Sequence, residues 1–450
     1  MKLELRDIEI PDFGIPQDVP VIPSSVYEER CNKAYEAAAA KWLIVYGDRE
    51  HFGNLFYLSG FDPRFEEALL IMGPNKVKYL LVGNEGYDYS ARAKINTEVL
   101  LCQSFSLMGQ DRSQAPRLDH ILKDIGLEKN DQVGICGWKY LEENEKITGS
   151  STIFVPAMIV ECIRSVVECP TSDVTEILMH PSKGIRAYNE VEEIVSLEFG
   201  ASRSSLAVMK IIEGLKTGMT EFQAVSNMGY AGEPLTAHVM FSAGKDTIIG
   251  LSSPTSKKIA LGDGVTTAVG YWGGLSCRAG LVAEEDEAFL KNLAKPYFKG
   301  VSTWYENAAI GMSGGTLFEK VSNVLAEGGL RPALNPGHLT STDEWMHTLV
   351  RPNSEEEIQS GMGMQLDIIP APLSVGKAVN CEDSVVFADK ALQDQLKATY
   401  PEVWERIRQR RLFLKNEIGL AIDDSLLPLS SNPGCFQPFW LSPDKMLTQK

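Results

Sequence analysis

The first half of the chain alternates short apolar runs with helical segments. Apolar runs at 42–46, 67–73 and 77–83 have the length of buried strands, and a proline–asparagine turn lies between the last two. Segments with helical spacing follow them, interrupted by further short apolar runs. This alternation predicts an α/β domain over residues 1–180, with a mixed sheet and flanking helices.

The second half begins at Pro181 and Gly184, which interrupt the chain before a long helical region. Thr220, with Gln223 three residues later, predicts the start of a further helix through a capping box. The other expected elements are strands at 235–244 and on both sides of a glycine-rich turn at 272–274, and helices within 287–330 and at 401–419. These elements predict an α+β domain over residues 181–450.

Composition and charge narrow the classes of function. A length of 450 residues suits two or three domains, and a net charge of −17 disfavours a nucleic-acid partner because phosphate is repelled on average. No apolar run approaches the roughly 18–20 residues that cross a bilayer, so no membrane partner is expected. Eight cysteines without a CxxC pair, and an N-terminus without an apolar leader, predict a reduced, cytoplasmic protein.

The densest group of chemically active side chains lies in the last third of the chain. His338 and His347 have Glu344 between them, and Asp367 and Glu382 follow on two predicted strands. An imidazole and carboxylates delivered from separate elements can act as general acid and base, bind a metal ion, or line a ligand pocket. The residues alone leave these three alternatives open.

Other side chains could complete such a site. Trp272 and Trp345 could wall a small-molecule pocket, although plain core packing also accounts for them. Arg278 could pair with Asp367 or Glu382, or bind a substrate carboxylate. A surface arginine of a hairpin is the alternative interpretation of Arg278.

Three further residues have both a structural and a functional interpretation. His51 and Arg64 lie in the polar loop after the strand at 42–46. In the structural interpretation, His51 is a turn histidine and Arg64 forms a salt bridge. In the functional interpretation, the loop projects toward a neighbouring active site. Cys277 could be activated as a nucleophile by the charge of Arg278, although no histidine is adjacent in sequence.

Seven phrases along the chain occur in the order known from one enzyme family. They are HFGNLFYLSGFDPRFEEALLI, GIRAYNEVEEI, LKTGMTEFQAV, IALGDGV, PGHLTSTDEWMH, SGMGMQLDIIP and VNCEDSVVFAD. With them the chain resembles the creatinase, prolidase and aminopeptidase P family over most of its length. The resemblance implies a C-terminal catalytic domain with the pita-bread fold and a homodimer. In such a dimer the N-terminal domain approaches the other subunit's pocket, which gives His51 and Arg64 a role across the interface.

The metallopeptidases of this family hold two metal ions with two aspartates, one histidine and two further acids. His338, Asp367 and Glu382 match three of these positions. The first aspartate position falls at Ala268, and the second falls within 275–279, where no acid occurs. The resemblance therefore implies a site without the usual two-metal centre, because the bridging carboxylate is lost.

The creatinase branch of the family uses a further histidine ahead of the first aspartate position. It would fall at about Gly250 and Leu251, where this sequence has none. His238, on the preceding predicted strand, could take its place in space, although a packed strand histidine is the plainer interpretation.

The expected function is hydrolysis of a C–N bond in a small peptide, amino-acid-derived or guanidino substrate, without a cofactor. The residues expected to transfer protons are His338, Glu344, His347, Asp367 and Glu382, and those expected around the substrate are Trp272, Arg278, Trp345, His238, His51 and Arg64. A single divalent ion, zinc or manganese, on His338, Asp367 and Glu382 is the alternative chemistry. The rival function is a catalytically inactive pseudopeptidase that binds a peptide or a small ligand.

Overall fold

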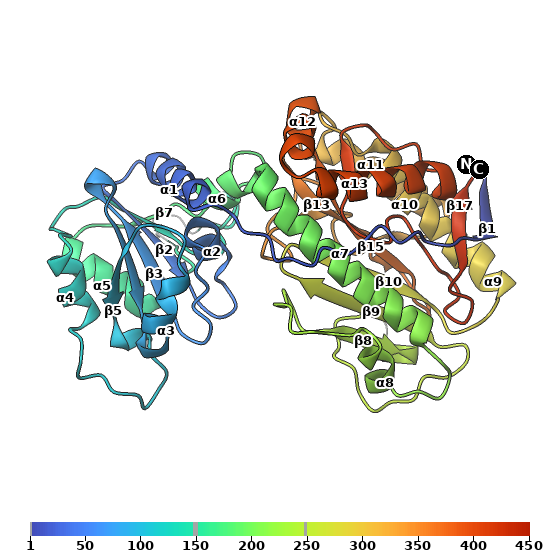
Figure 1. Cartoon of the computed structure of the whole chain (residues 1–450), viewed down its shortest axis with the longest axis horizontal. Coiled ribbons are helices and arrows are strands. Elements are labelled where there is room, and N and C mark those ends of the chain that lie inside the picture. The colour runs from blue at the N-terminus through green and yellow to red at the C-terminus, as the bar shows by residue number, and fades with distance from the viewer. Residues whose placement is uncertain (1, 147–151, 247–249) are drawn as a thin grey trace. The chain divides into compact units, whose positions relative to one another are not determined.

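The computed structural model describes residues 2–146, 152–246 and 250–450, which form two compact units (Figure 1). One unit is Val21–Ala187, and the other combines Tyr188–Lys450 with the N-terminal residues up to Pro20. Among the described residues, no helix is long and apolar enough to cross a membrane. All eight cysteines are free thiols.

The N-terminal arm belongs to the second unit, which differs from the expected domain range of 1–180. Its strand β1 (Leu3–Asp7) pairs antiparallel with β17 (Lys445–Gln449), the last strand of the chain. Leu3 and Ile8 are buried there, so removal of apolar surface from water accounts for the attachment.

The unit Val21–Ala187 is built on the mixed sheet with flanking helices that the sequence pattern predicts. Its strand order is β5-β4-β3-β2-β6-β7. The strands are β2 (Trp42–Gly47), β3 (Ala68–Met72), β4 (Lys78–Val82), β5 (Glu98–Leu101), β6 (Val133–Cys136) and β7 (Ser172–Asp173). The helices are α1 (Ser24–Ala38), α2 (Gly53–Ser59), α3 (Asn84–Tyr89), α4 (Leu118–Asp124), α5 (Ala157–Val167) and α6 (Glu176–Met179). Strand β3 is antiparallel to β2 and β4, whereas β6 runs parallel to β2.

The second unit contains an antiparallel sheet of seven strands. The order is β12-β13-β15-β10-β9-β8, and β16 pairs with β15. The strands are β8 (Met240–Ala243), β9 (Gly264–Tyr271), β10 (Gly274–Leu281), β12 (His338–Leu339), β13 (Gly363–Asp367), β15 (Asn380–Phe387) and β16 (Leu426–Pro428), and a small separate pair is β11 (Arg331–Pro332) with β14 (Pro370–Ala371). The helices are α7 (Val191–Gly214), α8 (Glu221–Ser226), α9 (Glu287–Phe289), α10 (Lys295–Asn307), α11 (Gly314–Glu327), α12 (Lys390–Thr399) and α13 (Pro401–Phe413).

Helix α7, the long green helix of Figure 1, packs against β9 and β10. Its apolar residues Ile211 and Ile212 lie in one buried cluster with Phe241 of β8 and Val269 of β9. The turn between β9 and β10 approaches α7 so closely that a Cβ at Gly200 would collide with the carbonyl of Trp272. Helix α7 therefore holds the β9–β10 hairpin, which forms one side of the candidate site.

The predicted capping box is confirmed at the start of α8. The Thr220 hydroxyl accepts a hydrogen bond from the backbone N–H of Gln223, and the Gln223 side chain accepts one from the backbone N–H of Thr220. Such reciprocal bonds satisfy two amides that the helix itself leaves without partners.

The basic run in α13 is largely internal. Arg410 is fully buried and its Nη1 lies 2.7 Å from a carboxylate oxygen of Glu198, which is also fully buried. Arg406 donates to the same carboxylate at 2.9 and 2.7 Å. These bonds hold the pKa of Glu198 below its usual value despite burial, which by itself would raise it. Arg406 and Arg410 thus join α13 to α7, whereas Arg408 is half-exposed.

Candidate functional site

The register of the second unit's sheet places four site positions in one row. Ala268 of β9 is opposite Cys277 of β10, Cys277 is opposite Glu382 of β15, and Glu382 is opposite Asp367 of β13. Residues directly opposite each other in an antiparallel sheet share a face, so these four side chains are neighbours. His338 of β12 is opposite Gln365, two residues before Asp367 and therefore on the same face.

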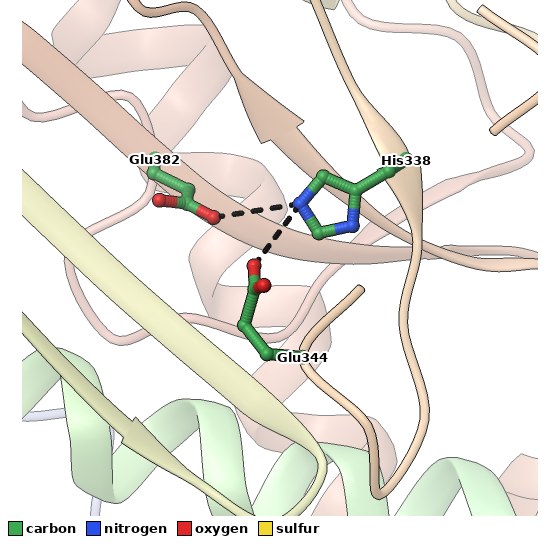
Figure 2. A group of neighbouring side chains, drawn as sticks. All are labelled: His338, Glu344 and Glu382. Atoms are coloured by element: carbon green, nitrogen blue, oxygen red, sulfur yellow. Dashed lines mark ion pairs between the residues drawn. The ribbon is translucent and has the colours of Figure 1, made fainter. Parts of the chain in front are cut away.

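His338 is fully buried and faces two carboxylates (Figure 2). Its Nε2 lies 3.2 Å from Oε1 of Glu344 and 3.7 Å from Oε1 of Glu382. Its Nδ1 lies 3.2 Å from the carbonyl oxygen of Leu339, which can only accept, so Nδ1 carries the proton of that bond. The imidazole is thereby oriented with Nε2 toward the acids.

A short loop brings Glu344 back to His338. Leu339 and His347 form a β-bridge, in which the Leu339 N–H donates to the His347 carbonyl at 2.7 Å. The Met346 N–H donates back to the Leu339 carbonyl at 3.0 Å. Trp345, about one third exposed, stacks on the His338 ring with centroids 4.2 Å apart. The loop therefore carries one acid and one aromatic wall of the site, and His347 takes part in closing it.

In the part of the chain that the structure describes, the buried carboxylates of Asp367 and Glu382 have few positively charged or hydrogen-bonding partners. Oδ1 of Asp367 and Oε1 of Glu382 are buried and have no hydrogen-bond partner among the described residues. Burial raises the pKa of Asp367 to about 7, against the opposing effect of His338. Burial and the adjacent Asp367 raise the pKa of Glu382 well above its usual value. For His338 burial alone would lower the pKa, but attraction to Glu344 and Glu382 raises it well above the usual value.

The other end of the row is apolar. Ala268, Leu275 and Cys277 form a small buried cluster against which Met240 of β8 packs. Burial and the charges of Glu382 and Asp367 raise the pKa of the Cys277 thiol well above its usual value. The thiol is therefore protonated at neutral pH, and the alternative of Cys277 as an activated nucleophile is not supported, because only the thiolate attacks.

The residues do not fit two metal ions but do fit one. A pair of ions needs bridging carboxylates, and the row offers a methyl group and a protonated thiol at Ala268 and Cys277, next to Glu382. One ion has suitable donors, because the site presents an imidazole nitrogen and buried carboxylate oxygens side by side.

Arg278 does not pair with the side chain of Asp367 or Glu382, contrary to expectation. It is fully buried, and its Nη2 lies 2.6 Å from Oδ1 of Asp383. Because side chains alternate along a strand, Arg278 and Asp383 occupy the face opposite to Cys277 and Glu382. The guanidinium is a structural group within the core and is not available to a substrate carboxylate.

The remaining expected residues of this unit lie beside the row. Trp272 follows β9 at the hairpin turn, about 10 Å or more along the strand direction from Ala268. His238 is exposed just before β8, and its Nε2 donates to the carbonyl of Leu251 at 2.8 Å. Contact of Trp272 and His238 with a substrate stays a prediction.

His51 and Arg64 lie in the first unit. The His51 ring stacks on Trp138 with centroids 4.3 Å apart, and its Nδ1 lies 3.2 Å from Asp48. Arg64 donates to the Tyr89 hydroxyl at 2.8 and 3.0 Å and lies 3.2 Å from Asp62. Each thus has local partners, and the role of both across a dimer interface stays a prediction.

The fold is similar to those of known peptidases. The prolidase of Thermococcus sibiricus is 15% identical with a TM-score of 0.65, over 82% of this chain and 96% of that chain. The prolidase of Pyrococcus horikoshii OT3 is 17% identical with a TM-score of 0.63, over 80% and 95%. The X-Pro aminopeptidase of Thermotoga maritima MSB8 is 13% identical with a TM-score of 0.62, over 81% and 95%.

The sequence itself matches no protein-family model and no curated protein. The structural similarities confirm the resemblance expected from the seven phrases at the level of the fold: the chain has the pita-bread fold of prolidases and X-Pro aminopeptidases.

Proposed function

We propose that the protein hydrolyses a C–N bond in a small peptide, amino-acid-derived or guanidino substrate, at one centre formed by His338, Asp367 and Glu382. The observation that carries this proposal is a buried group of one imidazole and several carboxylates. Nε2 of His338 lies 3.2 Å from Glu344 and 3.7 Å from Glu382, and Oδ1 of Asp367 and Oε1 of Glu382 have no hydrogen-bond partner among the described residues. Unpartnered buried acids destabilise a fold, so they are retained where a reaction or a ligand needs them. The prolidase-like fold supports hydrolysis as that reaction.

One divalent ion would be held by His338, Glu382 and one further carboxylate. Such an ion supplies Lewis-acid polarisation of the bond under attack. Asp367 accepts the proton of the attacking water through its unpartnered Oδ1 and returns it to the leaving nitrogen as the C–N bond breaks. The apolar side chains of Ala268, Cys277 and Met240 limit the water around the substrate.

Replacing His338 by alanine is expected to lower kcat/KM by about 100-fold or more, because proton-transfer and ligand groups contribute on this scale. Turnover of Xaa-Pro dipeptides and guanidino acids, measured with zinc or manganese present, tests this. His120→Ala in the first unit is the matched control, since its side chain is 60% exposed, and it should leave turnover unchanged. Full turnover by His338→Ala would contradict the proposal.

A binding role without turnover is the second candidate. Ala268 favours it, because the family's first aspartate position falls there, and residues 275–279, where the second falls, contain no acid. Ligands that raise Tm while no substrate is turned over at saturating metal would establish this role in place of hydrolysis.

A further inference from the structure

Glu344 and Asp367 are the two candidates for the third metal ligand beside His338 and Glu382, and their distances from these residues differ. Among the described residues, the donor atoms of His338, Glu344 and Glu382 all lie within 4.8 Å of one another, and Asp367 is outside this group. We propose that Glu344, delivered by the loop after β12, is the third ligand of a single divalent-metal site with His338 and Glu382. Asp367 is then left free of the ion.

The distances suit tetrahedral coordination. With zinc–ligand bonds of about 2.0–2.2 Å, tetrahedral ligands stand about 3.3–3.6 Å apart. Nε2 of His338 lies 3.2 Å from the Glu344 carboxylate and 3.7 Å from that of Glu382. Figure 2 shows both carboxylates turned toward this one nitrogen, so small adjustments place an ion among the three groups.

The orientation of His338 also suits a ligand. Its Nδ1 donates to the Leu339 carbonyl, and a hydrogen bond from the other ring nitrogen to a carbonyl is the usual support of a metal-binding histidine. Trp345 stacked on the ring restricts its rotation. Nε2 is buried, and the groups that it faces are the carboxylates of Glu344 and Glu382.

Charge distinguishes a metal site from an ordinary ion pair. A protonated His338 carries one positive charge, whereas Glu344, Glu382 and Asp367 together carry three negative charges when ionised. Within the described part of the chain, no other cation pairs with the Glu382 or Asp367 side chain, since Arg278 is bonded to Asp383 on the opposite face. A divalent ion neutralises more of this charge than one proton does.

The loop gives the ion a way in. The Glu344 side chain is 29% exposed, while those of His338 and Glu382 are 0% and 7% exposed. Glu344 is therefore the one donor of the three that contacts solvent to an appreciable extent. The β-bridge between Leu339 and His347 lies outside the ligand set and closes the loop without the ion.

Zinc titration of the full chain by calorimetry, after chelator treatment, tests the ligand set. The wild-type protein is expected to bind one equivalent, and Glu344→Gln to weaken binding by about 100-fold. Asp367→Asn removes a neighbouring charge but no ligand, so it is expected to weaken binding by no more than about tenfold, and Glu355→Gln, an exposed acid of the following segment, to bind within about threefold of wild type. Glu344→Asp, which keeps the charge and shortens the side chain, should give an intermediate affinity and guards against a folding defect in the first variant.

Unchanged zinc affinity in Glu344→Gln, or a loss in Asp367→Asn as large as that in Glu344→Gln, would overturn this inference. No zinc binding by the wild-type protein would overturn it as well. The inference deepens the proposed function, and binding separates the two. Zinc binding without turnover would contradict the proposed hydrolysis but not the metal site. Turnover in the presence of a chelator would contradict the metal site but not the proposed hydrolysis.

Discussion

Arg278→Met is expected to lower the free energy of unfolding of the Tyr188–Lys450 unit by about 3–5 kcal/mol, since removal of one partner leaves a buried charge uncompensated. Arg278 and Asp383 are both fully buried, with a 2.6 Å bond between them. The guanidinium also donates to four backbone carbonyls, those of Cys277, Glu382, Asn432 and Cys435, at 2.7–2.8 Å. Methionine has similar length but none of these donors, so all five acceptors lose a bond.

Chemical denaturation measures this loss. Arg408→Met is the matched control, because Arg408 is half-exposed and pairs with Glu405 on the surface of α13. Exposed pairs contribute about 0–1 kcal/mol, so the control should unfold close to the wild type. A change below about 1 kcal/mol in Arg278→Met would show that the arginine is not the structural group described above.

Asp367→Asn is expected to stabilise the metal-free protein at pH 8 by up to about 4 kcal/mol. Burial raises the pKa of Asp367 from 3.8 to about 7, and every tenfold change in proton affinity corresponds to about 1.4 kcal/mol. The titratable groups that interact with this carboxyl are His338, Glu344, Glu382, Cys277 and Tyr297. Of these, only His338 lowers the pKa of Asp367, and its charge is shared with two other acids.

The direction of this change in stability with pH follows from proton binding to Asp367. A raised pKa means that the folded state binds more protons than the unfolded state between about pH 4 and 7, so stability falls as the pH rises through that window. Asparagine does not ionise and avoids this loss, and the difference between variant and wild type should grow from pH 4 to 7 and then level off. Thermal unfolding of chelator-treated protein measures it, with Asp394→Asn on exposed α12 as the control. A difference that does not change with pH would contradict the account.

The local pattern of apolar and polar residues is sufficient to predict most helices and strands. The strand pair at 68–82 and the capping box at Thr220 follow from residues close in sequence, and their partners are as expected. The pairing of β1 with β17 joins the two ends of the chain and leaves no local signal. The expectation that residues 1–180 form one domain missed it for that reason.

At the site, the partner of Arg278 differs from the expected one. The alternation of side chains along a strand could have predicted the direction of Arg278. If Cys277 faces the site, the adjacent Arg278 must point to the opposite face, toward Asp383 rather than Glu382. Glu344 is six residues from His338 in a loop whose closure depends on the Leu339–His347 bridge. That closure is not encoded in a periodic pattern, so the sequence places Glu344 only among the proton-transfer residues and names His338, Asp367 and Glu382 for the single-ion alternative.

The number of metal ions per chain, measured together with turnover, tests the central claim of one hydrolytic centre most directly. Protein loaded with increasing zinc or manganese is predicted to saturate at one ion per chain, with hydrolysis of its substrate rising in proportion and disappearing on chelation. Saturation at two ions per chain, or full hydrolysis by the metal-free protein, would contradict the account.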